Sequence, residues 1–338
     1  MDVGKLPNRT LARLLGRVQA HDPRVIVGPG IGRDAAVIDT GGPNLLVAKT
    51  DPITFAADSI GAYAVHVNAN DIACTGATPA WFLATVLLPK GSSAHLARTI
   101  FDQITSACAS LNVELVGGHT EVTYRLDRPI VVGAMLGEVA RDRLVRPDGG
   151  QEDDALILTR GIAIEGTAVL AREAPDRLAA LGVSRHSIKA AARYISDPGI
   201  SVVKDAAAVC NAVTVHALHD PTEGGLATAL YELAEASGCG IVIQPEAIEI
   251  LPLTRTICDA AALNPLGLLA SGALLIAVAP DDCDAAIAAI ADAGSTARRI
   301  GSLVTAERGV IMKVNRRRRR APRFARDEVA RFLSGNQV

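Results

Sequence analysis

Hydrophobic and polar positions follow two different periods along this chain, which predicts short strands mixed with longer helices. Between residues 59 and 76, apolar side chains such as Val65, Ala69 and Ile72 return at helical spacing. Elsewhere in the first half, short β-rich runs predict strands at 35–38, 45–49, 82–88, 114–116 and 130–139, and a helix at 92–111 that Ser92 or Ser93 caps.

The second half of the chain shows the same mixture of strand and helix patterns. Its patterns predict strands at 155–159, 240–244 and 273–278, and helices at 165–172, 200–211, 223–237 and 281–293. Because hairpins and crossovers are mixed, the fold class predicted is α+β. The aperiodic, charged segment 141–154 is the predicted linker, which gives domains at 1–150 and 151–315. Residues 316–338 are predicted to be a basic stretch followed by a terminal helix, and we interpret Arg316–Arg320 as solvated.

Composition narrows the class of protein. A chain of 338 residues has room for two domains, and 49% hydrophobic with 21% charged residues excludes a disordered chain. A net charge of −2 argues against a nucleic-acid partner. No apolar run reaches the roughly 20 residues of a membrane span, and the six cysteines are scattered without any C-x-x-C pair. We therefore expect a cytoplasmic enzyme with no membrane partner.

The candidate chemistry lies in acidic residues at the ends of predicted elements. Asp34 precedes one strand, and Asp51 follows the next, where Pro52 is expected to stop the ladder. Asn68 and Asp71 lie three positions apart, on one face of an otherwise apolar helix. Taken singly, each residue is more typical of a turn, a strand end or a satisfied core amide.

Two further motifs add to this set. Gly117 and Gly118 follow a short strand, where paired glycines let backbone N–H groups approach an anion. Asp220 precedes a helix that Thr222 is expected to cap. Several carboxylates converging on one cleft imply cations, and hard oxygen ligands suit Mg²⁺. Since the chain has no G-x-x-x-x-G-K-[ST] motif, these residues together predict a metal-bridged ATP site.

A family resemblance rests on eight motifs spread along the chain. They are GRDAAVI from residue 32, KTD from 49, VNANDIACTGA from 67, GGHTEV from 117, EGTA from 165, DPTEGG from 220, NPL from 264 and SGALL from 271. Together they resemble the superfamily of aminoimidazole ribonucleotide synthetase (PurM), selenophosphate synthetase, thiamine-monophosphate kinase and the hydrogenase-maturation protein HypE. The chain is most similar to HypE-like "AIR synthase related" proteins.

The resemblance implies a PurM-like fold, in which an N-terminal sheet domain dimerises to form an ATP cleft and a C-terminal α/β domain covers it. It implies Mg²⁺ ligands at Asp34, Asp51, Asp71 and Asp220. It places a phosphate-facing turn at Gly117, Gly118 and Thr120, with Thr50 and Asn68 beside the metals. Nucleotide contacts are implied for Arg146 and, in the N-terminal segment, for Lys5.

The implied activity is ATP-dependent and Mg²⁺-requiring, with transfer of the γ-phosphoryl group to an oxygen of a small acceptor. Asp51, Asp71 and His119 are the candidate catalytic residues. The alternatives are thiamine-monophosphate kinase and a nucleotide-binding accessory protein that turns over little ATP in a maturation complex. His66 and His219 we interpret as packed or supporting residues.

Departures from the family pattern bear on the subtype. HypE carries a carbamoyl group on a C-terminal cysteine. The last 50 residues here contain no cysteine, so we do not expect this protein to carry a carbamoyl group on its C-terminal tail. No cysteine precedes Cys74, which disfavours selenophosphate synthesis. Arg33 and His119 stand where relatives often have acidic residues, which leaves the number of Mg²⁺ ions open. His119 either donates to a phosphate or makes a structural hydrogen bond.

Overall fold

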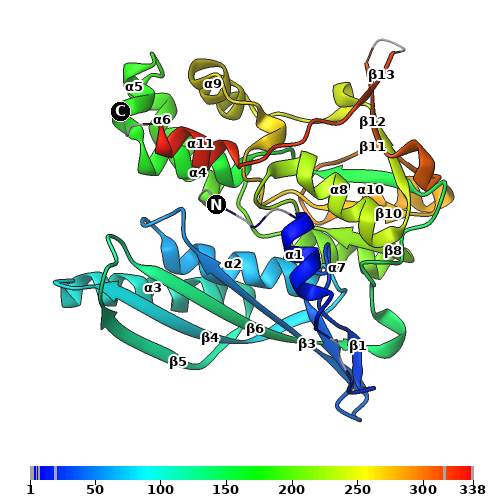
Figure 1. Cartoon of the computed structure of the whole chain (residues 1–338), viewed down its shortest axis with the longest axis horizontal. Coiled ribbons are helices and arrows are strands. Elements are labelled where there is room, and N and C mark those ends of the chain that lie inside the picture. The colour runs from blue at the N-terminus through cyan, green and yellow to red at the C-terminus, as the bar shows by residue number, and fades with distance from the viewer. Residues whose placement is uncertain (1–3, 5, 7, 19–20, 315–316, 336–338) are drawn as a thin grey trace. The chain divides into compact units, whose positions relative to one another are not determined.

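The computed structural model describes residues 4, 6, 8–18, 21–314 and 317–335. The chain divides into two compact units, each with its own sheet and helices (Figure 1). The N-terminal unit comprises residues 21–28 and 34–144. The C-terminal unit comprises residues 29–33, 145–314 and 317–335, together with the described residues up to 18. The mixture of sheets and helices in both units confirms the predicted α+β class.

The N-terminal unit is built on a six-stranded sheet. In spatial order its strands are β1 (Val25–Val27), β2 (Ala36–Ile38), β3 (Asn44–Ile53), β6 (Ile130–Ala140), β4 (Thr78–Pro89) and β5 (Glu114–Thr123). Neighbouring strands are antiparallel except β4 and β5, which are parallel. Two helices, α2 (Ile60–Ala73) and α3 (Ala94–Leu111), lie on one face of this sheet (Figure 1).

The helix α2 is buried along almost its whole length. It packs against β3, β4 and β6 on one side and against α3 on the other, so apolar residues are needed all round it. Asn68 and Asp71 are therefore fully enclosed polar groups, which require partners inside the unit. The neighbouring helix α3 begins as predicted, since the hydroxyl of Ser93 accepts a hydrogen bond from the N–H of Leu96.

Three local predictions were wrong. Pro52 does not stop its strand, because β3 beyond Ala48 pairs with β6 but no longer with β2, and an edge-like position tolerates proline. The turn expected at Gly117 and Gly118 is instead the middle of β5, which continues to Thr123. Thr222 does not cap the following helix, whose N-cap is Gly224 in a left-handed conformation.

The C-terminal unit contains a seven-stranded sheet. Its spatial order is β13 (Arg317–Arg320), β12 (Val310–Val314), β9 (Gly240–Ile243), β11 (Ala297–Val304), β7 (Ala155–Thr159), β10 (Leu275–Val278) and β8 (Val215–His219). Every residue of β7 and β10 is buried, so this part of the sheet lies inside the core.

Helices surround this sheet and its connections. They are α1 (Asn8–Leu15), α4 (Ile164–Glu173), α5 (Pro175–Ala180), α6 (Arg185–Ala191), α7 (Val203–Ala212), α8 (Gly225–Ser237), α9 (Pro252–Ala261), α10 (Cys283–Asp292) and α11 (Glu328–Ser334). The sequence patterns missed α1, α5, α6, α9, β1, β8 and β13, which are short elements with too few turns or alternations to produce a clear period.

The basic stretch is exposed where the structure describes it, but it forms a strand that the sequence did not predict. Arg317–Arg320 form the exposed edge strand β13, and a terminal helix, α11, follows; Arg316 lies outside the described residues. A row of like charges on an edge strand opposes pairing with another sheet. All six cysteines are free thiols. Among the helices described, none combines the length and the hydropathy that crossing a bilayer requires.

Candidate active site

Two neighbouring elements of the N-terminal unit bring four of the motif residues together. Strand β3 carries Lys49 and Asp51, and helix α2, which packs against it, carries Asn68 and Asp71. The ammonium of Lys49 lies 3.0 Å from Oδ2 of Asp71 and 3.7 Å from Oδ2 of Asp51. These four residues are called the Lys49 cluster below.

The amide of Asn68 connects the helix to the strand. Its Nδ2 donates to the carbonyl of Ala64, at 2.8 Å, and to the carbonyl of Asp51, at 3.3 Å. Its Oδ1 is buried and has no hydrogen-bond partner among the residues that the structure describes. A buried carbonyl oxygen left without a donor costs free energy, so this atom is suited to a ligand that supplies positive charge.

The backbone beside the cluster is closely packed. A Cβ at Gly133 of β6 would lie 2.4 Å from Nδ2 of Asn68 and 2.7 Å from the ring of Phe82. The carbonyl of the same glycine accepts a hydrogen bond of 2.8 Å from the hydroxyl of Thr50. The absence of a side chain at 133 therefore lets the Asn68 amide reach the strand, and Thr50 is held to β6 next to Asp51.

Charge in the cluster is balanced by the lysine. Burial alone would lower the pKa of Lys49, but the carboxylates of Asp71, Asp51 and Asp34 outweigh it and raise that pKa above its ordinary value. Lys49 is therefore a permanent cation. Asp34 acts on it from the end of the loop that enters β2. Of the four predicted metal ligands, three belong to this electrostatic group.

The donor set fits a hard divalent cation. Asp51, Asp71 and Oδ1 of Asn68 are all oxygen donors, which is the chemistry that Mg²⁺ prefers. The unpaired Oδ1 of Asn68 is an acceptor that a cation could use. Lys49 already supplies one positive charge to the same carboxylates, so a cation bound here would meet acids that are partly neutralised.

The residues expected around a phosphate lie along β5, at the edge of the sheet. Gly117, Gly118, His119 and Thr120 are all exposed. The ring of His119 contacts the carboxylate of Glu121, with 3.2 Å between Nε2 and Oε2. This contact matches the structural hydrogen bond that the sequence allowed, and it leaves two thirds of the His119 side chain accessible.

In the same unit His66 of α2 is half-buried. Burial lowers its pKa to about 4, so the ring is neutral at physiological pH. Its Nδ1 has no hydrogen-bond partner in the described part of the chain. A partly buried, neutral imidazole agrees with the interpretation of His66 as a packed residue.

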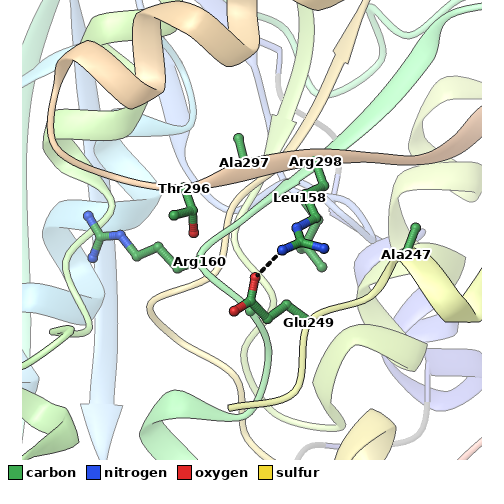
Figure 2. Close-up of a pocket in the computed structure, with 8 residues that line it drawn as sticks. Leu158, Arg160, Ala247, Glu249, Thr296, Ala297 and Arg298 are labelled. Atoms are coloured by element: carbon green, nitrogen blue, oxygen red, sulfur yellow. Dashed lines mark ion pairs between the residues drawn. The ribbon is translucent and has the colours of Figure 1, made fainter.

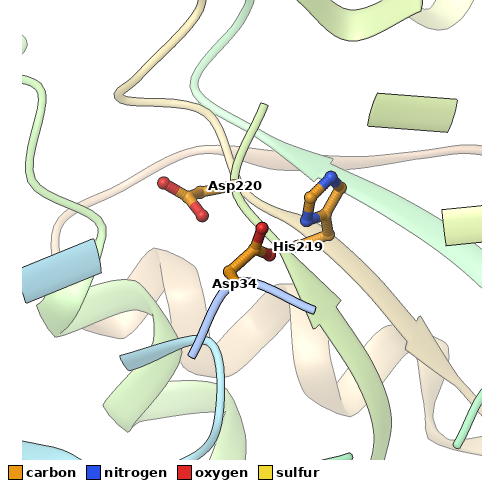
Figure 3. A group of neighbouring side chains, drawn as sticks. All are labelled: Asp34, His219 and Asp220. Atoms are coloured by element: carbon orange, nitrogen blue, oxygen red, sulfur yellow. The ribbon is translucent and has the colours of Figure 1, made fainter. Parts of the chain in front are cut away.

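In the C-terminal unit, Asp220 follows the end of β8 and is almost inaccessible. Figure 3 shows its side chain together with that of the preceding residue, His219. The imidazole of His219 contacts Glu232 of α8, with 3.2 Å between Nε2 and Oε2, and both side chains are buried. His219 is thus tied to a helix, which agrees with a supporting role.

Two more buried acids accompany Asp220. Burial raises the pKa of Glu165 to about 7, and the charges of Asp327 and Asp220 act in the same direction. Burial also raises the pKa of Asp327 to about 7, although its carboxylate accepts 2.7 Å hydrogen bonds from the N–H groups of Gly224 and Val329. Asp327 therefore attaches the C-terminal segment to the glycine turn that follows Asp220.

These raised pKa values predict a pH-dependent stability. The folded protein keeps the proton on Glu165 to about pH 7, whereas the unfolded chain releases it near its ordinary value of 4.5. The stabilisation is therefore complete at low pH and is lost as the pH rises from about 4.5 to 7. We expect the melting temperature of Glu165→Gln to fall less than that of the wild type between about pH 5 and pH 8.

Melting curves over that pH range measure this difference. The control is Asp281→Asn, which changes an exposed carboxyl of the same unit. Parallel curves for Glu165→Gln and the wild type would mean that Glu165 is ionised throughout and would contradict the expectation.

The remaining predicted contacts are less informative. The guanidinium of Arg146 pairs with Asp148 through two hydrogen bonds of 2.8 Å, so it is held within the chain. Lys5 lies outside the described residues. A separate small hollow, lined by Arg160 and Arg298 among others, contains the ion pair between Arg298 and Glu249 (Figure 2). Because Arg160 is likewise paired with Asp205, this hollow offers little to a charged ligand.

Sequence reasoning missed three residues of these groups. Lys49 and Glu165 belong to motifs but have no predicted role, and Asp327 has none either. A signal existed for Lys49, since it is a lysine two positions before a candidate metal ligand in a strand. Asp327 had none, because a lone acid after a basic stretch is indistinguishable from an ordinary helix cap.

Comparison with known proteins shows the family of this chain. Residues 32–139 match the model of the AIR synthase related protein, N-terminal domain, and residues 151–314 match that of the C-terminal domain. The chain belongs to the AIR synthase related family. The carbamoyl dehydratase HypE of Cupriavidus necator is 29% identical over 91% of this chain and 85% of its own. A hydrogenase expression/formation protein, HupE of Azotobacter chroococcum, is 30% identical over 70% and 68%.

Solved structures of this family share the fold, which confirms the PurM-like two-domain architecture. HypE in a HypE–HypF complex aligns with a TM-score of 0.73 at 22% identity, over 92% of this chain and 98% of its own. A HypE in complex with ATP aligns at 0.68 and 22%, over 97% and 98%. A ThiL complexed with AMPPCP and TMP aligns at 0.68 and 19%, over 83% and 87%.

Proposed function

We propose that this protein is a HypE-like, ATP-dependent and Mg²⁺-requiring enzyme that transfers the γ-phosphoryl group of ATP to an oxygen of a small acceptor. The observation that carries the proposal is the Lys49 cluster, in which two carboxylates and an orphaned amide oxygen lie together on β3 and α2. The relatives solved with ATP and with AMPPCP support the choice of nucleotide.

The chain's own residues would bind and orient rather than form bonds. Phosphoryl transfer needs positioning and neutralisation of charge, and little covalent work from side chains. Asp51, Asp71 and Asn68 would hold Mg²⁺, which when bound offsets the charge of the polyphosphate. Asp34 and Asp220 stay predicted ligands. Gly117, Gly118, Thr120 and His119 would face the phosphates along β5, and Thr50, Arg146 and Lys5 stay predicted nucleotide contacts.

We further propose that the active form is a homodimer. The exposed edge strand β5 carries two half-exposed valines, Val116 and Val122, next to the residues proposed for phosphate binding. Apolar side chains on an unpaired strand edge are typical of a surface that another chain covers. A second copy seated there would shield these valines from water.

Two other functions each have a specific observation in their favour. The structural match to a ThiL complexed with TMP favours a thiamine-monophosphate kinase. The match to HypE in a HypE–HypF complex favours a nucleotide-binding accessory protein that docks onto a maturation partner. The three functions predict different requirements for ADP release by the protein. The proposed enzyme needs a small acceptor, a thiamine-monophosphate kinase needs thiamine monophosphate, and an accessory protein is stimulated by no small acceptor.

An acceptor screen that measures ADP release separates them. We expect the purified full chain, with ATP and Mg²⁺, to release ADP at least about tenfold faster in the presence of one small acceptor than without any. The panel includes thiamine monophosphate, formylglycinamidine ribonucleotide, selenide and a carboxamide. Since the proposal assigns nucleotide binding to the cluster, the Asp71→Asn variant should show no stimulation. ATP binding without stimulation by any acceptor would leave the accessory protein as the better description.

A further inference from the structure

We propose that Lys49 is a built-in counter-ion that takes the place of one divalent cation in the Lys49 cluster and lowers the affinity of the protein for free Mg²⁺. This inference rests on the proposed function, since it concerns the same carboxylates. It assigns a positioning role to a residue that had no predicted role.

The first reason is where the ammonium lies. Lys49 Nζ contacts Oδ2 of Asp71, one of the two carboxylate oxygens that this residue could offer to a metal, and it lies 3.7 Å from Oδ2 of Asp51 as well. A Mg²⁺ ion binds carboxylate oxygens at about 2.0–2.1 Å and carries two charges. Such an ion and the ammonium cannot share one oxygen without strong repulsion, so the two cations compete for Asp71.

The second reason is the burial of the pair. The side chain of Asp71 is 3% accessible and that of Lys49 is 16% accessible, so water screens neither charge well. An ionised carboxylate enclosed in this way needs a positive partner at all times. Lys49 supplies it in the protein without ligands, and it is attached to β3, which is paired with β6 along its whole length.

The third reason is what the lysine leaves unsatisfied. It neutralises the carboxylates but, as an ammonium, it has no contact with Oδ1 of Asn68 among those described, and that oxygen remains without a partner. The cluster therefore has one position filled by Lys49 and one acceptor still available to a metal. We infer that the N-terminal unit is built for fewer divalent ions than its number of carboxylates suggests.

The test is Mg²⁺ binding without nucleotide, measured on the full chain by calorimetry and by melting temperature in Mg²⁺ against EDTA. For Lys49→Met we expect Mg²⁺ to bind about tenfold or more tighter than to the wild type, and to raise the melting temperature of the variant but hardly that of the wild type. Lys49→Arg, which keeps the charge, should resemble the wild type. Lys90→Met is the control, since Lys90 is exposed elsewhere in the same unit.

Equal Mg²⁺ affinities for a folded Lys49→Met and the wild type would overturn the proposal. If Lys49→Met does not fold even with Mg²⁺, the double variant Lys49→Met with Asp71→Asn, which removes both charges of the pair, distinguishes a counter-ion role from a packing role. Recovery of the fold shows that the lysine acts as a counter-ion, and no recovery shows that it acts through packing, which refutes the proposal. None of these measurements uses ATP, so their outcome is independent of the acceptor screen.

Discussion

Replacing Gly118 with alanine is expected to destabilise the N-terminal unit by about 3 kcal/mol or more. The Cβ of an alanine at this position would lie 1.9 Å from the carbonyl oxygen of Ala84, on the neighbouring parallel strand β4. That oxygen belongs to the backbone, so it cannot move without separating the two strands. The φ angle of Gly118 is +146°, a conformation that residues with a side chain rarely adopt.

The adjacent glycine provides a matched control. An alanine at Gly117 would meet only the side chain of Leu83, at 3.9 Å, and Gly117 has no positive φ. We expect Gly117→Ala to change the free energy of unfolding by less than about 1 kcal/mol. Urea denaturation of both variants measures the difference. Equal destabilisation by the two substitutions would mean that the close contact with Ala84 does not limit residue size at 118.

This pair also separates two reasons for the double glycine. From sequence alone, both glycines were predicted to let backbone N–H groups reach a phosphate. The structure supplies a packing reason for Gly118 and none for Gly117. A loss of ATP binding in a stable Gly117→Ala variant would therefore point to the phosphate role that we propose for this strand.

Replacing Asp71 with asparagine is expected to abolish the binding of Mg²⁺·ATP, with a loss of at least about 100-fold in affinity. Asparagine has the shape of aspartate but no charge, so the proposed metal loses an anionic ligand in a buried site. The same change leaves the Lys49 ammonium facing only Asp51, at 3.7 Å, in the cluster, which adds repulsion against any incoming cation. Titration with ATP at fixed Mg²⁺ measures the loss.

The control for Asp71→Asn is Asp102→Asn, an exposed carboxylate on α3 of the same unit. It should bind nucleotide as the wild type does, and circular dichroism should show that both variants are folded. Nucleotide affinity that is unchanged in Asp71→Asn, and also in Asp51→Asn, would refute the assignment of these residues to the metal.

Much of the fold could be predicted from local patterns. The helix α2 and the strands β6 and β7 appear within a few residues of where the apolar spacing put them, because a buried face imposes its period on the sequence. Predictions failed where a neighbouring strand determines the local structure. Pro52 is tolerated because β2 no longer pairs at that end of β3, and Gly118 continues a strand because β4 runs parallel beside it. Neither neighbour can be identified from the residues around the position.

The sequence by itself determined the α+β class, the family and the chemical types of the candidate ligands, since these depend on which residues occur and how they are spaced. Only the tertiary structure decided which charges meet. Lys49 and Asp71 are far apart in the chain, and their contact exists because α2 packs on β3. Asp327 meets Gly224 for a similar reason. A pattern of residues carries the period of an element, but partners across elements follow from packing and register.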